Sequence, residues 1–228
     1  MQEVTVHRVD FGYFVRPAEE TGSGLPRVEP CLGYVVDHPD GVLLFDSGMG
    51  AHPDVDAHYR PRRVALPDAL SPIGSSIEAI THVANCHLHF DHCGGNPLLP
   101  GRPVFVQETE LAEATGAVDY TLPELLESST FEKVSGDAEI LTGVWLTPTP
   151  GHTTGHQSLF IRQPDGTVVV AGQSHDTATD YAGHQMAWRA HRDGHAQPLP
   201  DVPEWMDRLQ ALDPRIVYFA HDHSAWVP

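Results

Sequence analysis

Hydrophobic and polar residues alternate over short stretches in the first part of the chain, which is the pattern of half-buried β-strands. Three such stretches cover residues 3–14, 31–38 and 41–48. The turn sequence His-Pro-Asp followed by Gly41 predicts a hairpin between the second and third of them. Further elements are expected downstream, namely strands at 79–88 and 103–107 and helices at 66–76 and 108–116. The last of these helices is expected to end near Gly116.

The second half of the chain repeats this scheme. Strands are predicted at 144–149, 157–163, 167–172 and 215–221, and a helix at 202–212. Residues 173–200 are the least regular stretch, rich in His, Gly and aromatic residues, and we expect them to form a loop or lid. Two β-rich halves, each followed by helices, predict two sheets packed face to face with helices outside. No linker or repeat divides the chain, so residues 1–228 are predicted to form a single domain.

Composition narrows the possible functions. The formal net charge of -18 disfavours nucleic acid and anionic membranes as partners. The N-terminal segment lacks the basic and apolar regions of a signal peptide, and the apolar runs are too short to span a bilayer. Three cysteines without a C-x-x-C pair argue against a disulfide framework, so we expect a cytoplasmic protein. The chain has sixteen histidines but only thirteen lysines and arginines, and this excess of histidine calls for a chemical explanation.

A histidine cluster directly follows the apolar stretch at 79–85. Three histidines and an aspartate lie within six residues, and they are His87, His89, Asp91 and His92. On an extended segment His87 and His89 project to the same side, because side chains alternate with a period of two. A tight turn can then bring Asp91 and His92 to face a second point nearby. Imidazole and carboxylate are zinc ligands, so this segment can offer donors to two adjacent metal ions.

Other predicted strands also end in candidate ligands or supporting carboxylates. His152 follows the strand at 144–149 through a Pro-Gly turn, and His221 ends the strand at 215–221. Asp46 lies at the strand end within the stretch 41–48, before a turn of small residues. Four strand ends that carry such side chains are expected where loops at one edge of a sandwich build a site.

Together these motifs resemble the metallo-β-lactamase superfamily. They are H-x-H-x-D-H at 87–92, D-S-G at 46–48, P-G-H at 150–152 and F-x-H-D at 219–222. Within the superfamily, the stretches 86–99, 103–111 and 149–161 look most like the N-acyl-homoserine-lactone lactonases, the quorum-quenching branch. The resemblance implies a four-layer αββα sandwich of the α+β class, with its metals at one edge. It also implies two ligand sets, His87, His89 and His152 for the first metal and Asp91, His92 and His221 for the second.

One position departs from the family pattern. The family usually has an aspartate after the strand at 167–172, and its carboxylate bridges both metals, whereas this chain has Gln173. An amide oxygen can coordinate a metal but carries no charge, so we expect the second metal to bind more weakly. His175 or Asp176 are alternative donors, and the sequence leaves this choice open. The tyrosine with which the lactonases assist the substrate carbonyl would fall, by spacing, on Asp176.

The predicted function is a metal-dependent hydrolase that opens a small lactone or related ester with a metal-bound hydroxide. Zn²⁺ is the expected cofactor, with two ions per chain, although other divalent transition metals suit the same donors. Asp91 is the candidate for passing a proton to the departing alcohol. Asp46 and His156 are expected to orient ligands without binding metal themselves. The alternatives are a thioester hydrolase of the glyoxalase II kind and a binding protein whose catalysis is impaired by Gln173.

Overall fold

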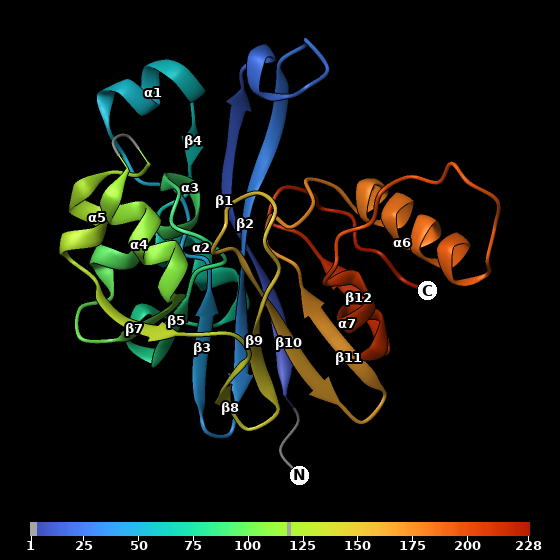
Figure 1. Cartoon of the computed structure of the whole chain (residues 1–228). Coiled ribbons are helices and arrows are strands. Elements are labelled where there is room, and N and C mark those ends of the chain that lie inside the picture. The colour runs from blue at the N-terminus through green and yellow to red at the C-terminus, as the bar shows by residue number, and fades with distance from the viewer. Residues whose placement is uncertain (1–3, 118–119) are drawn as a thin grey trace.

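In the computed structural model, which describes residues 4–117 and 120–228, the chain forms two β-sheets that pack face to face (Figure 1). The first sheet has the strand order β4-β1-β2-β3-β5-β6-β7. Its strands are β1 (Thr5–Arg16), β2 (Arg27–His38), β3 (Gly41–Phe45), β4 (Arg62–Arg63), β5 (His82–Ala84), β6 (Pro103–Gln107) and β7 (Thr130–Val134). Strands β1 to β3 form an antiparallel meander, whereas β3, β5, β6 and β7 run parallel.

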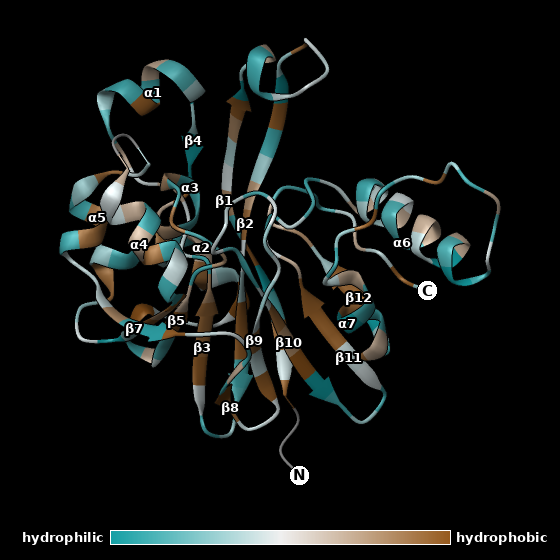
Figure 2. Cartoon of the chain, in the orientation of Figure 1, coloured by the Kyte–Doolittle hydropathy of each residue, from teal (hydrophilic) through white to brown (hydrophobic). Residues whose placement is uncertain are grey.

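The second sheet has the order β12-β11-β10-β9-β8. Its strands are β8 (Ala138–Leu141), β9 (Val144–Pro148), β10 (Gln157–Gln163), β11 (Gly166–Val170) and β12 (Pro214–Tyr218). The inner faces of the two sheets share one core, because alternate residues of each strand point inward. Leu32 and Tyr34 of β2 belong to the same buried cluster as Leu159 and Ile161 of β10. Most of the central strands are therefore coloured as hydrophobic in Figure 2.

Helices cover the outer face of each sheet. The α-helices are α1 (Pro53–Tyr59), α2 (Leu66–Leu70), α3 (Phe90–Cys93), α4 (Glu108–Gly116), α5 (Pro123–Glu127), α6 (Ala178–Arg192) and α7 (Met206–Ala211). Leu70 of α2 packs with Val35 and Leu44 on the first sheet, while Tyr181 of α6 packs with Val217 on the second. The four-layer sandwich predicted from the sequence is confirmed. Among the described residues, none of the helices has the length and apolar character needed to cross a bilayer.

The structure corrects the expectation for residues 173–200. Fifteen of these residues form α6, and its Tyr181 and Gln185 are buried against the second sheet, so the middle of the segment is a packed helix, while residues 173–177 and 193–200 are irregular as expected. The sequence does contain an N-cap residue at the start of this helix, although the His- and Gly-rich composition of the segment obscures it. Thr177 is the N-cap, and its hydroxyl accepts a hydrogen bond of 3.1 Å from the backbone N–H of Asp180.

Two predicted elements are shorter than expected. The helix expected at 66–76 ends at Leu70 and continues only as a 3-10 turn, Ser71–Ile73, where Pro72 has no N–H to donate. The strand expected at 79–88 is confined to β5, because Ile77–Ala79 forms a 3-10 turn before it. The chain leaves the sheet after Ala84, and this early exit carries the histidine cluster to the edge of the sandwich.

Candidate metal centre

Three imidazole nitrogens from two separate segments converge at this edge. His87 and His89 follow β5, and His152 lies on the loop between β9 and β10. Nδ1 of His89 lies 2.9 Å from Nε2 of His87 and 3.1 Å from Nε2 of His152. Bonds of about 2.0–2.1 Å to a tetrahedral zinc ion would place its donors roughly 3.3 Å apart. The observed spacing is close to that value, so these three nitrogens can share one metal ion.

A second triangle of donors lies beside the first. Oδ2 of Asp91 lies 3.4 Å from Nε2 of His92 and 3.4 Å from Nε2 of His221, and the two nitrogens are 3.3 Å apart. All three side chains are buried. The ring centres of His87 and His92, one from each triangle, are 4.1 Å apart. The arrangement therefore fits two neighbouring metal ions of the kind that the sequence predicted.

Hydrogen bonds at the far side of the rings orient the converging nitrogens. Nδ1 of His221 donates to the carbonyl oxygen of Pro30 at 2.8 Å, so its Nε2 keeps a lone pair. Nδ1 of His92 donates to Oδ2 of Asp46 at 3.0 Å. The other oxygen of Asp46 accepts the backbone N–H of Cys86 at 2.8 Å. Asp46 thus contacts a donor of the second triangle without joining it.

Burial controls the protonation of the first triangle. Desolvation lowers the pKa of His87 well below its ordinary value, that of His89 to about 4 and that of His152 to about 3. These imidazoles are therefore neutral at pH 7, which is the form that binds metal.

The second triangle carries opposite charges that stabilise each other. Burial by itself raises the pKa of Asp91, but the adjacent His92 and His221 outweigh it and hold the pKa below the usual range. Burial likewise opposes the charged form of His92, whose pKa is nevertheless raised by its neighbours Cys86, Asp91 and Asp46. Asp91 is therefore an ionised carboxylate, the form that a metal requires.

Gln173, which follows β11, is placed at the second triangle. Its side-chain oxygen Oε1 lies 3.2 Å from Nε2 of His92. Its backbone N–H donates to Nε2 of His156 at 3.1 Å, and Nδ1 of His156 lies 3.1 Å from the carbonyl oxygen of Thr149. His156 therefore supports Gln173 through its backbone and has no nitrogen left for a metal, in line with its expected orienting role.

The turn that ends the histidine cluster packs with its backbone directly against the loop that follows β3. A Cβ atom on Gly94 would overlap the backbone of Met49 and Gly50, and one on Gly95 would overlap the carbonyl oxygen of Ser47. Glycine is needed at both positions because any side chain would push the two segments apart.

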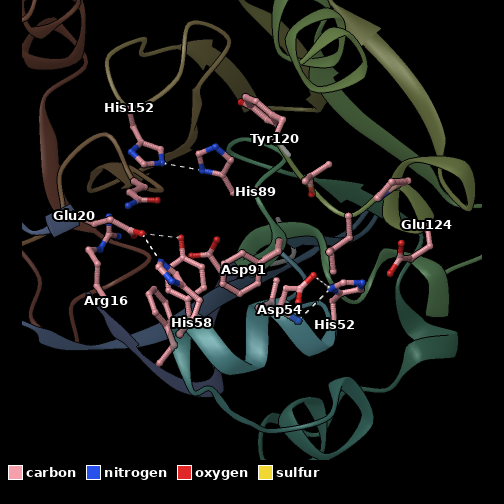
Figure 3. Close-up of a pocket in the computed structure, with 18 residues that line it drawn as sticks. Arg16, Glu20, His52, Asp54, His58, His89, Asp91, Tyr120, Glu124 and His152 are labelled. Atoms are coloured by element: carbon pink, nitrogen blue, oxygen red, sulfur yellow. Dashed lines mark hydrogen bonds and ion pairs between the residues drawn. The ribbon is translucent and has the colours of Figure 1, made fainter. Parts of the chain in front are cut away.

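A pocket of about 690 Å³ opens onto the donors (Figure 3). Asp91, His89, His152 and Gln173 contribute to its wall, together with the tip of the β1–β2 hairpin, α1 and residues 120–124. Much of the lining is apolar, with contributions from Phe14, Val55, Tyr59, Phe90 and Leu122. At the pocket rim, Nε2 of His58 in the last turn of α1 lies 2.8 Å from Oε1 of Glu20.

Comparison with known proteins decides the family. The family model of the Metallo-beta-lactamase superfamily matches residues 26–221 of this chain. The chain belongs to this superfamily. It is 30% identical to an N-acyl homoserine lactonase from Bacillus thuringiensis over 155 residues, which cover 62% of each protein. The N-acyl homoserine lactonase AttM of Rhizobium johnstonii is 26% identical over 171 residues, 63% of this chain and 64% of the relative. The matched part thus spans less than two thirds of the length of these superfamily members.

Solved structures of superfamily members share the fold. An N-acyl homoserine lactone hydrolase with N-hexanoyl-L-homoserine bound at its catalytic metal centre superposes with a TM-score of 0.72. That match covers 96% of this chain and 93% of the other, at 23% identity. AidC, a dizinc quorum-quenching lactonase, has a TM-score of 0.71 at 16% identity and covers 96% of this chain and 87% of its own.

The alternative donors near Gln173 lie outside both triangles. Nε2 of His175 faces Nδ1 of His184 at 2.8 Å, and its ring packs against Tyr181 on the outer face of the second sheet. Asp176 is bound instead by Arg27, whose Nη2 donates to Oδ2 at 2.5 Å. The structure therefore leaves Gln173 as the side chain that faces the second triangle from this segment. Asp176 is likewise engaged at the position where the lactonases of the superfamily were expected to have a tyrosine.

Glu110, a residue that no sequence motif indicated, joins the two segments of the first triangle. This fully buried carboxylate on α4 accepts hydrogen bonds from the backbone N–H of Leu88 (2.7 Å), Thr153 Oγ1 (2.7 Å) and Tyr120 Oη (2.5 Å). Burial raises its pKa, while these hydrogen bonds act in the opposite direction. A glutamate in a helix of alternating polar residues looks solvent-exposed, so the local sequence carries no signal for this role.

Proposed function

We propose that this chain is a metal-dependent hydrolase that opens a lactone, with N-acyl homoserine lactones as the favoured class. The observation that carries the proposal is the pair of adjacent donor triangles at one end of a partly apolar pocket. The named lactonase relatives support the choice of substrate, and one lactonase structure superposes on 96% of this chain. An acyl chain would fit against the apolar part of the pocket wall, while the ring would lie at the donors.

The donor set suits two divalent transition-metal ions, with Zn²⁺ as the expected one. In this assignment His87, His89 and His152 hold the first ion. Asp91, His92 and His221 hold the second, with Oε1 of Gln173 as an additional neutral donor. When bound, such ions bring the pKa of a water molecule near neutrality and polarise a substrate carbonyl.

Asp91 supplies the proton transfer in this scheme. Its Oδ2 belongs to the second triangle, and its side chain also lines the pocket. As water adds to the carbonyl carbon, this carboxylate takes up the released proton. The ring C–O bond then breaks, and Asp91 delivers the same proton to the departing alcohol oxygen, so that water and lactone together become a hydroxy acid.

The proposal is tested with protein stripped of metal and then reloaded with ZnCl₂. We expect hydrolysis of N-acyl homoserine lactones, followed as acid release, to be absent in the stripped protein and restored by zinc. A glutathione thioester and a β-lactam are assayed in parallel. Turnover of the thioester without the lactones would favour the glyoxalase II kind of reaction. Inertness of the reloaded protein toward all three classes would favour a binding protein instead.

A further inference from the structure

Two arginines face each other at the tip of the β1–β2 hairpin, next to the second donor triangle. Arg16 and Arg27 are directly paired across the antiparallel strands, where like charges repel. Glu29, which is 2% exposed, lies between them. Its carboxylate accepts two hydrogen bonds of 2.8 Å from Arg16 and one of 2.6 Å from Nε of Arg27. This carboxylate compensates one of the two positive charges.

Asp176 compensates the second positive charge of the arginine pair. Nη2 of Arg27 donates to its Oδ2 at 2.5 Å, an ion pair that links the hairpin to the segment after β11. The side chain of Arg27 is 35% exposed and that of Asp176 is 33% exposed, so this pair is shielded from bulk water but not sealed. Because it is paired with arginine, the carboxylate of Asp176 is ionised, and its two oxygens can only accept hydrogen bonds.

The remaining oxygen of Asp176 determines how the amide of Gln173 is turned. Nε2 of Gln173 donates to Oδ1 of Asp176 at 3.3 Å, while Oε1 of the same amide lies 3.2 Å from Nε2 of His92. The flipped amide would place two acceptor oxygens in contact and would turn its NH₂ group toward the donor triangle. An amide NH₂ has no lone pair available for a metal ion, so only the observed orientation can provide a ligand.

We propose that Asp176, held by Arg27, is a positioning residue that keeps Oε1 of Gln173 directed at the second metal. The inference rests on the proposed metal centre and concerns this chain's own substitution of the usual bridging aspartate. A carboxylate at position 173 would present two equivalent oxygens and need no such control. A glutamine presents one oxygen and one NH₂ group, so it depends on a neighbour to choose between them.

Zinc titration of the metal-free full chain tests this role without reference to catalysis. Asp176→Asn keeps the size of the side chain but provides an NH₂ group as well as an oxygen, so that the amide of Gln173 can flip. We expect the second equivalent of zinc to bind about 10–100-fold more weakly, the usual effect of losing a group that supports a ligand, while the first is unchanged. Asp201→Asn, which removes the same charge from an exposed position, should leave both equivalents as in the unmodified protein.

The same substitution in a Gln173→Asp background separates positioning from a simple effect of charge. If Asp176 acts by orienting the amide, Asp176→Asn should not weaken the second site there, because a carboxylate needs no orientation. An equal loss in both backgrounds would overturn the inference, as would unchanged zinc binding in the single variant. Failure of the proposed function is distinct, since it would appear as zinc binding of the expected pattern without hydrolysis of lactones. Thermal unfolding of each variant verifies that the fold is retained.

Discussion

Oε1 of Glu110 accepts a hydrogen bond of 2.7 Å from the backbone N–H of Leu88, the residue between His87 and His89. The other carboxylate oxygen accepts from Thr153, the neighbour of His152. One buried side chain therefore ties together the two segments that supply the first donor triangle. These segments are far apart in sequence, so their relative position depends on this contact more than on local backbone preference.

Glu110→Gln should loosen the first metal site. The amide keeps one acceptor oxygen for Leu88 and turns an NH₂ group toward the Thr153 hydroxyl, which must then accept instead of donate. The hydrogen bonds to a charged carboxylate are lost, at a cost of about 1–3 kcal/mol in the free energy of unfolding. We expect the first equivalent of zinc to bind about 10–100-fold more weakly. Urea unfolding and zinc titration measure these two effects. The exposed Glu108 on the same helix provides the control, and Glu108→Gln should change neither quantity. Unaltered zinc affinity in Glu110→Gln would contradict the argument.

His152→Ala should remove the first metal and, with it, hydrolysis. This residue lies on an exposed loop, so truncation removes one donor of the triangle at little cost to the core. His87→Ala should have the same effect on metal content, although it also leaves a cavity in the buried part of the site. Elemental analysis gives the metal content per chain, and the exposed His195 supplies the control variant His195→Ala. Full metal content in both ligand variants would refute the assignment.

Gln173→Asp should strengthen the second metal site. A carboxylate places a negative charge between two dications, whereas the amide leaves their repulsion less compensated. In the unmodified protein we therefore expect unequal occupancy, with the metal of the second triangle partly lost on dialysis. The substitution should tighten the second equivalent of zinc by at least about tenfold, since one added charge interaction in a partly buried site exceeds roughly 1.4 kcal/mol. Two equally tight equivalents in the unmodified protein would show that the amide is sufficient.

The metal-free protein should become less stable as the pH falls from 6.5 toward 4. Burial lowers the pKa of His89 to about 4 and that of His152 to about 3, while the unfolded chain takes up these protons near pH 6.5. Below pH 6.5 the unfolded state thus binds more protons, which costs the folded state about 1.4 kcal/mol per pH unit for the partly buried His89 and less for His152, whose exposed side chain is screened by solvent. The raised pKa of His92 has the opposite sign: its stabilising contribution grows as the pH falls through about 6.5 and is complete only below that value, so it offsets part of the loss near neutrality.

Urea midpoints of the metal-free protein at pH 7.0 and pH 5.0 measure this dependence, with the lower midpoint expected at pH 5.0. His152→Ala should reduce the difference, because one of the lowered groups is gone. A midpoint at pH 5.0 equal to or above that at pH 7.0 would show that these imidazoles are not neutral in the folded apo-protein.

The alternation of hydrophobic and polar residues was sufficient to predict two packed sheets, and the resemblance to the superfamily supplied the two proposed donor sets, whose atoms the structure brings together. Strand alternation follows from backbone geometry, and the spacing of His87, His89, Asp91 and His92 places donors on one short segment whatever lies around it. Most of the predicted strands were found, because a period of two is a strong signal where one face is buried. The helix α6 escaped prediction, since its buried face is formed by Tyr181 and Gln185 among many polar residues.

Only the tertiary structure decided which groups act on these donors. The choice among Gln173, His175 and Asp176 depends on partners distant in sequence: His92 faces the first, and Arg27 holds the third. Glu110 meets Leu88 and Thr153 only because α4 packs beside both loops. Hydrogen bonds between remote segments are set by packing of whole elements, and no local pattern of residue types encodes them.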